Sequence, residues 1–254
     1  MSQAGTITSK STLDTLNNHV SIRRYTNQDI DQSLLEALLN AARRSPTSSN
    51  MQTYSLVVVR DPEKKAKLAE YANNQRQVAE CPVFVALVAD TFRIQAAAEL
   101  HGSSVAQNLE NSLTSIIDAA LVGMSLSTAA ESVGLGTVMI GAMRNHPAEV
   151  AELLNLPHGA FVVFGLCLGW PDEEQIPPQK PRLPEELVIH YERYDDSNTT
   201  TQLQQHDDEL AAHYESLGRN LNSAAWTGVV ADKYSNPRRP FLREVLTKLG
   251  MNFE

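Results

Sequence analysis

The segment "AFVVFGLCLGWPDEEQIPPQKPRLP" (160–184) decides the fold, because two opposite kinds of sequence meet in it at Trp170. Residues 160–170 form an almost continuous apolar run, which predicts a strand in a sheet covered on both faces by helices. Residues 171–184 contain five prolines in fourteen positions and predict an extended chain. We therefore expect a single domain over residues 1–254 whose C-terminal part, from about residue 171, is an extended excursion over the main domain or over a partner subunit.

The rest of the chain alternates apolar runs with helical patterns. Further strands are predicted at residues 54–60, 82–90 and 137–141. One helix is predicted to begin after Asp29 or Asp31 and to include residues 34–42. Further helices are predicted at residues 62–72, 104–133, 147–156 and 240–249. An earlier helix is expected to run from Thr12 or Asp14 toward His19. The polar segment 195–209 is interpreted as a connection that leads into another helix.

Composition excludes several functional classes. A net charge of −9 and a sequence pI of about 5.3 argue against a general nucleic-acid or anionic-membrane binder, which needs a basic surface. The N-terminal "MSQAGTITSK" has no apolar core, so no secretory signal is expected. The long apolar helix carries Asp118 and several hydroxyls, which favours a buried helix over a membrane span. These features predict a cytoplasmic protein with no nucleic-acid or membrane partner.

The common catalytic motifs are absent from the sequence. There is no G-x-G-x-x-G turn after a first strand, no Walker loop, no H-E-x-x-H and no G-x-S-x-G. Cys81 and Cys167 both lie in apolar runs and are interpreted as buried thiols in strands, with no metal site and no disulfide framework.

Three segments offer the chemistry of an anion site. A phosphate is bound best by fixed positive charges and forked donors, which arginine supplies. Basic residues occur in "SIRRY" (21–25) and in "KPRLP" (180–184), and a run of hydroxyls lies at residues 47–49. The residues alone leave two interpretations open: an anion clamp assembled from distant segments, or ordinary surface side chains.

A family resemblance favours the first interpretation. The stretches "HVSIRRYT", "ARRSPTSSNMQ", "NNQRQVAECPVF", "ESVGLGTVMIGAMRN" and "FGLCLGWPDEEQIPPQKPRLP" occur in this order from about residue 13 onward. Together they resemble the oxygen-insensitive NAD(P)H nitroreductases and FMN reductases of the nitroreductase-like flavoprotein superfamily, in the branch of larger NADPH-linked members. The resemblance implies an α+β sandwich with a central mixed sheet flanked by helices, and a homodimer with FMN at the subunit interface. It also implies a C-terminal extension that wraps over the partner subunit.

The resemblance also implies the residues that bind the cofactor. Lys180 is expected near the pyrimidine edge of the flavin, and Arg23 and Arg182 are expected on its phosphate. The hydroxyl loop is expected to approach the flavin of the other subunit. The implied FMN-binding set is His19, Ser21, Arg23, Thr47, Ser49, Gln75, Ile140, Gly141, Lys180 and Arg182.

The nicotinamide donor is implied to be NADPH or NADH. For the 2′-phosphate of NADPH the resemblance implies Arg239. Arg219, in the loop before Trp226, is a second candidate, although it has no clear counterpart in the family. Leu217 and Asn222 stand where similar proteins place arginines, so NADH is expected to compete with NADPH. Val20 replaces a frequent arginine and Ala142 a frequent second glycine, and the methyl group of Ala142 is expected to crowd the flavin edge or a substrate.

The implied activity is two-electron transfer from NAD(P)H through FMN to nitroaromatics, quinones, azo dyes, chromate or flavins, in a ping-pong sequence. No side chain must act as acid or base, since the flavin carries the chemistry. No catalytic residue and no metal are therefore expected. Two alternatives stay open: a non-catalytic FMN-binding protein, and a superfamily relative that uses reduced flavin for flavin cleavage or dehalogenation.

Overall fold

The computed structural model describes residues 10–219 and 225–253, and the chain divides into two compact units. The first unit comprises the described residues through Pro177 together with those from Phe241 onward. The second unit runs from Pro178 to Pro240. The division falls a few residues after the composition change at Trp170.

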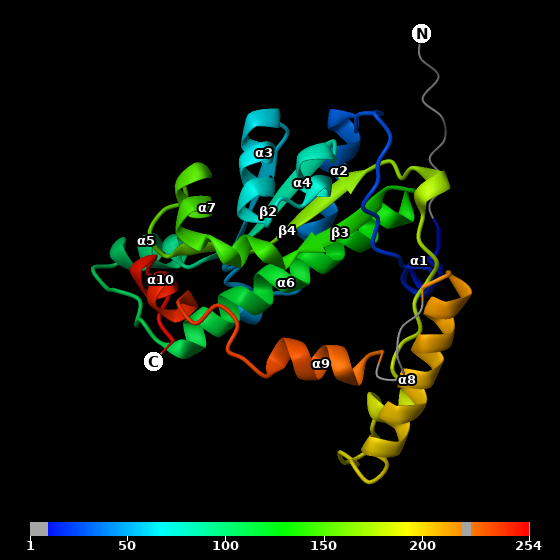
Figure 1. Ribbon diagram of the computed structural model, residues 1–254. Coiled ribbons are helices and arrows are strands. Elements are labelled where there is room, and N and C mark those ends of the chain that lie inside the picture. Colours follow the sequence, from blue (N-terminus) through cyan, green and yellow to red (C-terminus); the bar gives the residue numbers. More distant parts are fainter. Residues whose placement is uncertain (1–9, 220–224, 254) are drawn as a thin grey trace. The chain divides into compact units, whose positions relative to one another are not determined.

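A four-stranded sheet forms the centre of the first unit (Figure 1). Its strands are β1 (Tyr54–Val59), β2 (Val83–Asp90), β3 (Gly136–Ile140) and β4 (Ala160–Gly169), in the order β1-β2-β4-β3. All four predicted strands are confirmed. Every residue of β2 and β4 is buried, as the continuous apolar runs predicted.

All three strand pairings are antiparallel, so the expectation of a mixed sheet is wrong for the described residues. An apolar run shows that both faces of a strand are covered, but it carries no information on the direction of the neighbouring strand. Helices on both faces produce the same run in an antiparallel sheet as in a parallel one.

Helices cover the two faces of the sheet and form two separate apolar clusters. Helices α2 (Gln32–Ala42) and α6 (Leu109–Ser132) pack on one face, where Leu35, Leu38 and Leu126 are buried. Helices α3 (Pro62–Tyr71), α4 (Arg76–Glu80) and α7 (Pro147–Leu153) pack on the other (Figure 1). This arrangement confirms the expected α+β fold class.

Local sequence explains where several helices begin. The Asp61 side chain accepts a hydrogen bond from Lys64 N at the start of α3, and Pro62 occupies a first-turn position where no donor is needed. Asn108 caps α6 by accepting from Asn111 N. That cap starts the helix five residues later than the predicted residue 104.

Helix α6 is long and apolar enough to cross a membrane by length and composition alone. It instead contacts all four strands of the sheet as well as α2. Asp118 in its middle is buried, with 1% of its surface exposed. Such a position is that of a core helix, as the sequence predicted.

Two helices of the first unit escaped the sequence analysis. Helix α5 (Phe92–Glu99) buries none of its residues and therefore lacks an apolar period. Helix α4 has only five residues, and Cys81 caps its C-terminal end instead of lying in a strand. Both thiols are nevertheless buried and free. The remaining short elements are α1 (Thr12–Asn17), η1 (Ser48–Asn50), η2 (Gly141–Asn145) and η3 (Glu173–Gln175).

Helix α10 (Leu242–Lys248) returns the chain to the first unit and confirms the predicted docking helix. Leu246 and Met251 are buried in the cluster that also contains α2 and α6. The chain thus closes on its own core after the second unit.

The second unit contains η4 (Glu185–Leu187), α8 (Thr199–Ser216) and α9 (Thr227–Tyr234). The helix expected after segment 195–209 is α8, but it begins at Thr199, so the predicted connection is too long by about ten residues. The helix is stabilised by its buried side: Asp207 accepts hydrogen bonds from Trp226 N at 2.6 Å and Thr227 N at 2.9 Å at the start of α9. A carboxylate of one helix therefore caps the next.

Candidate functional site

The segment His19–Tyr25 lies along one edge of the sheet and is held there by backbone hydrogen bonds. Ile22 N donates to Thr137 O of β3 at 2.8 Å, and Thr26 N donates to Trp170 O at 2.9 Å beyond the end of β4. Gly136 permits this close approach, since a Cβ there would lie 2.7 Å from the Ile22 side chain. The predicted anion-binding segment is therefore fixed to the sheet rather than loose.

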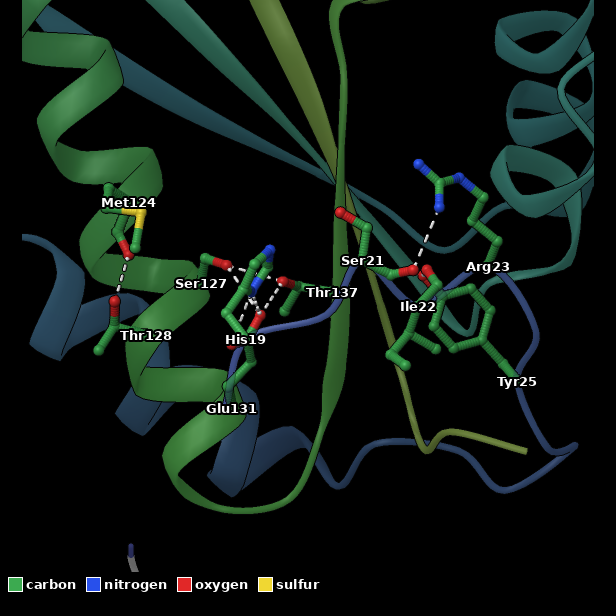
Figure 2. Close-up of polar contacts among 10 residues, drawn as sticks. All are labelled: His19, Ser21, Ile22, Arg23, Tyr25, Met124, Ser127, Thr128, Glu131 and Thr137. Atoms are coloured by element: carbon green, nitrogen blue, oxygen red, sulfur yellow. Dashed lines mark hydrogen bonds and ion pairs between the residues drawn. The ribbon is translucent and has the colours of Figure 1, made fainter. Parts of the chain in front are cut away.

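Side chains of this segment alternate between the core and the surface. Ile22 is buried, whereas Ser21 is half-buried and Arg23 is exposed (Figure 2). Arg23 Nη1 donates to Ser21 O at 3.2 Å, and in the part of the chain that the structure describes Arg23 forms no ion pair. Arg24, in contrast, approaches Glu80 at 3.9 Å. Of the two adjacent arginines, Arg23 is thus the one whose charge is not matched by a carboxylate of the described chain.

His19 lies against a buried hydrogen-bond network on α6 and β3 (Figure 2). Its Nδ1 atom is 2.9 Å from Glu131 Oε1 and 3.0 Å from Glu131 Oε2. Thr137 Oγ1 donates to Glu131 Oε1 at 2.6 Å, and Ser127 Oγ lies 2.7 Å from Thr137 Oγ1. The first residue of the predicted site is therefore held by groups from two other elements.

The hydroxyl loop is anchored by Asp118 of α6. Asp118 Oδ1 accepts from Ser48 N at 3.0 Å, and Oδ2 accepts from Thr53 N at 3.1 Å and Thr53 Oγ1 at 2.7 Å. Between these anchors the backbone is left-handed at Ser49 (φ 47°), Asn50 (φ 58°) and Gln52 (φ 55°). Non-glycine residues adopt such angles only where surrounding contacts impose them. The contacts of Asp118 supply that constraint.

Gln75 and the end of β3 occupy defined positions in the first unit. Gln75 precedes α4 and accepts a hydrogen bond from Gln77 Nε2 at 2.6 Å. Ile140 is buried at the last position of β3, and Gly141 begins η2 beside the guanidinium group of Arg144.

The two positions that depart from the family pattern both face the protein. Ala142 packs against the apolar cluster formed with α3, α4 and α7. Val20 lines a cavity of about 120 Å³ together with Ile22 and Glu131. The Ala142 methyl group thus makes a core contact, and its expected crowding of a flavin or substrate stays a prediction.

The remaining predicted cations all lie in the second unit. Lys180 and Arg182 are exposed, and the Lys180 ammonium lies 5.6 Å from the centroid of the Tyr214 ring. Arg219 is exposed as well. Burial, and then the neighbouring Arg238, lower the pKa of Arg239. The joining of Arg23 with Lys180 and Arg182 in one clamp stays a prediction.

Leu217 and Asn222 stand where arginines were expected from the resemblance. Leu217 is exposed at the end of α8. Asn222 lies outside the described residues. Among residues 10–219 and 225–253, no group of three or more His, Cys, Asp or Glu side chains is placed to hold a metal ion.

Sequence analysis missed two acidic residues that position the predicted site. Asp118 and Glu131 both lie on α6 and each hold a segment that is distant in the sequence. The available signal was an ionisable residue inside an apolar helix, because a buried charge requires partners. From the sequence alone, Asp118 argues only against a membrane span.

Fold and site together define the class: an α+β domain with an antiparallel sheet between helices, whose rim carries a basic segment and a hydroxyl loop. The chain belongs to the nitroreductase family, as the sequence resemblance implied. The nitroreductase family model matches residues 16–170, and the model of the family's C-terminal domain matches residues 180–254.

Relatives match over nearly the whole chain. A Bacillus subtilis protein named FMN reductase [NAD(P)H] is 35% identical over 95% of this chain and 98% of its own length. A Salmonella typhimurium oxygen-insensitive NADPH nitroreductase is 35% identical over 94% of this chain and 97% of its own. The solved structure of Bacillus megaterium NfrA2 has a TM-score of 0.91 and 35% identity, with 96% of this chain and 98% of that one covered.

Proposed function

We propose that this protein is an FMN-dependent oxidoreductase that transfers two electrons from NAD(P)H to small acceptors. The observation that carries the proposal is the full-length likeness to proteins named FMN reductase, NADPH-flavin oxidoreductase and oxygen-insensitive NADPH nitroreductase. A Pseudomonas relative named Cr(VI) reductase, 35% identical, supports chromate as one of the acceptors to be tested. Nitroaromatics, quinones, azo dyes and free flavins are the other candidates.

The described residues fit the chemistry of FMN. A phosphate needs a cation whose charge is not already neutralised, and Arg23 meets this requirement within the described chain. Arg182 is proposed as its partner on the phosphate, and Lys180 at the N1–C2 edge of the flavin. The hydroxyls of Ser21, Thr47 and Ser49 are proposed as further donors.

The protein's part in the reaction is to bind and orient. When bound, FMN supplies the hydride and electron chemistry. Gln75 and the chain at Ile140 and Gly141 are proposed to border the flavin ring, and Arg239 with Arg219 to contact the 2′-phosphate of NADPH. No described side chain is assigned as an acid or base. Donor and acceptor are expected to use one site in turn, because both would exchange electrons with the same flavin.

We further propose a homodimer that works in the cytoplasm. One side of α6 exposes Leu113, Ile117, Leu121 and Met124, each between 41% and 56% exposed. A stripe of large apolar side chains is characteristic of a subunit interface. The chain just before the hydroxyl loop borders this stripe, since Ser45 Oγ lies 3.5 Å from Leu121 O. This supports the proposal that the loop approaches the flavin of a partner subunit.

The deciding experiment mixes the purified protein with NADPH in the absence of oxygen. Release of FMN on denaturation, fast bleaching of flavin absorbance by NADPH, and reoxidation by a quinone or nitroarene are expected. A protein without flavin that binds none when it is added would contradict the cofactor assignment. A flavin that stays oxidised would instead support the alternative of a non-catalytic FMN-binding protein. Products of flavin cleavage or dehalogenation would support the other alternative.

A further inference from the structure

We propose that Glu131 is a positioning residue for His19, which fixes the proton of the imidazole on Nδ1 and thereby determines what Nε2 can offer to the cofactor. This inference rests on the proposed function, in which the His19–Arg23 segment binds FMN. Glu131 itself is assigned no contact with the flavin. It acts through His19.

The proton positions follow from the hydrogen-bond network. Thr137 has a single hydroxyl proton, and it donates that proton to Glu131 Oε1 at 2.6 Å. Ser127 Oγ lies 2.7 Å from Thr137 Oγ1 and 3.3 Å from Glu131 Oε1, so its single proton goes to the threonine oxygen or to the carboxylate, and in both cases Glu131 is an acceptor. An ionised carboxylate only accepts. His19 Nδ1, about equally close to both carboxylate oxygens, must therefore carry a proton.

A proton on Nδ1 limits the role of Nε2 to two states. In the neutral ring Nε2 is an acceptor, suited to a hydroxyl such as those of the ribityl chain. In the protonated ring it is a donor, suited to a phosphate oxygen. The other neutral tautomer, with the proton only on Nε2, would place an acceptor against the Glu131 carboxylate and is disfavoured.

The groups around His19 are buried and held in place by hydrogen bonds. Ser127 and Thr137 are 2% and 1% exposed, and the Glu131 side chain is 14% exposed. The backbone at Ile22 is tied to the carbonyl of the same Thr137. Thr137 of β3 thus holds the segment through its carbonyl and holds the carboxylate that orients His19 through its hydroxyl. Figure 2 shows the second of these contacts.

Glu131→Gln is the direct test, because it keeps the size of the side chain. With Thr137 still donating to the amide oxygen, the amide NH₂ faces His19 Nδ1 and favours the Nε2–H tautomer. Nitrogen NMR of the full chain with ¹⁵N-labelled histidine, prepared without FMN, should show His19 protonated on Nδ1 in the parent protein. The Nε2–H form should appear in the variant. His19→Asn assigns the resonance.

The same variant should weaken FMN binding about tenfold, measured by quenching of flavin fluorescence. Glu149→Gln is the matched control, since Glu149 pairs with His146 at 3.4 Å on the surface, and it should change nothing. In a His19→Asn background the Glu131→Gln change should have no further effect, because neighbouring groups that act through one another are not additive.

Two results would overturn the proposal: unchanged FMN affinity in Glu131→Gln, or an equal loss with and without His19, which would reveal a purely structural role. If that variant fails to fold, Thr137→Val supplies the same comparison, with an expected loss of about threefold that again requires His19. A parent protein that binds no FMN would refute the proposed function instead, while the NMR result would still decide the proton position.

Discussion

Replacing Asp118 with asparagine should release the hydroxyl loop. The carboxylate accepts three hydrogen bonds, one from Ser48 N and two from Thr53. Asparagine has one oxygen, so it retains the two bonds to Thr53 and turns its NH₂ toward Ser48 N–H. A bond to a charged group is worth about 1.5–3 kcal/mol, against about 0.5–1.5 kcal/mol for a neutral one.

Weakening the two bonds to Thr53 is expected to cost about 1–1.5 kcal/mol each, and losing the bond to Ser48 to add at most about 1 kcal/mol, because water can replace the carboxylate there. The expected total is about 2–4 kcal/mol in local stability. The lower part of this range reflects Ser48, which is exposed and can be hydrated. Backbone angles at Ser49, Asn50 and Gln52 are left-handed and would lose their constraint. The loop should then open without general unfolding.

Hydrogen exchange of the peptide spanning residues 47–54, read by mass spectrometry, measures this directly. Since 1.4 kcal/mol is about tenfold, the expected cost corresponds to exchange roughly 30- to 1,000-fold faster in Asp118→Asn. Asp208→Asn, an exposed aspartate of α8, is the control and should leave this peptide unchanged. Unaltered exchange at residues 47–54, or faster exchange spread evenly over the sheet, would refute the anchoring role.

Three further predictions follow from the proposed function. Arg23→Ala and Arg182→Ala should each weaken FMN binding about ten- to a hundred-fold, because a charge-assisted contact is worth about 1.5–3 kcal/mol; unchanged titrations for both would remove the phosphate clamp. Sedimentation at low micromolar concentration should give a dimer, since obligate interfaces bury on the order of 2,000 Å² or more; a flavin-loaded monomer of 28.0 kDa would contradict it. NADPH should be preferred over NADH by less than about a hundredfold in kcat/KM at fixed quinone. Arg239→Ala should lower only the NADPH value, and equal losses for both donors would exclude Arg239.

The sequence predicted the strands well because burial leaves a direct trace in composition. The apolar runs around Val85 and Leu166 require cover on both faces, and both residues are fully buried. Composition does not show whether neighbouring strands run parallel or antiparallel, and for this reason the prediction of a mixed sheet was wrong. Helix α5 escaped for the same reason, since none of its residues is buried.

The site was predictable only as a set of segments. Arg23 could be proposed from residue type and from the family resemblance, but its lack of an ion pair in the described chain, beside the pairing of Arg24 with Glu80, required coordinates. Glu131 contacts His19, which is 112 residues away in the sequence, and Asp118 contacts Ser48, which is 70 residues away. No local pattern encodes contacts of that separation, because they depend on how α6 crosses the sheet.

Helix α6 also sets the distance between Asp118 and Glu131. Asp118 and Glu131 are thirteen residues apart, which at a rise of 1.5 Å per residue is about 20 Å. Adding or removing one residue between them would shift one end by about 1.5 Å and rotate it by about 100°, so that one carboxylate would lose its partners. Length variation among natural homologues should therefore be absent between these two positions. It should be tolerated in the connection 100–108, which precedes the helix and bears on neither carboxylate.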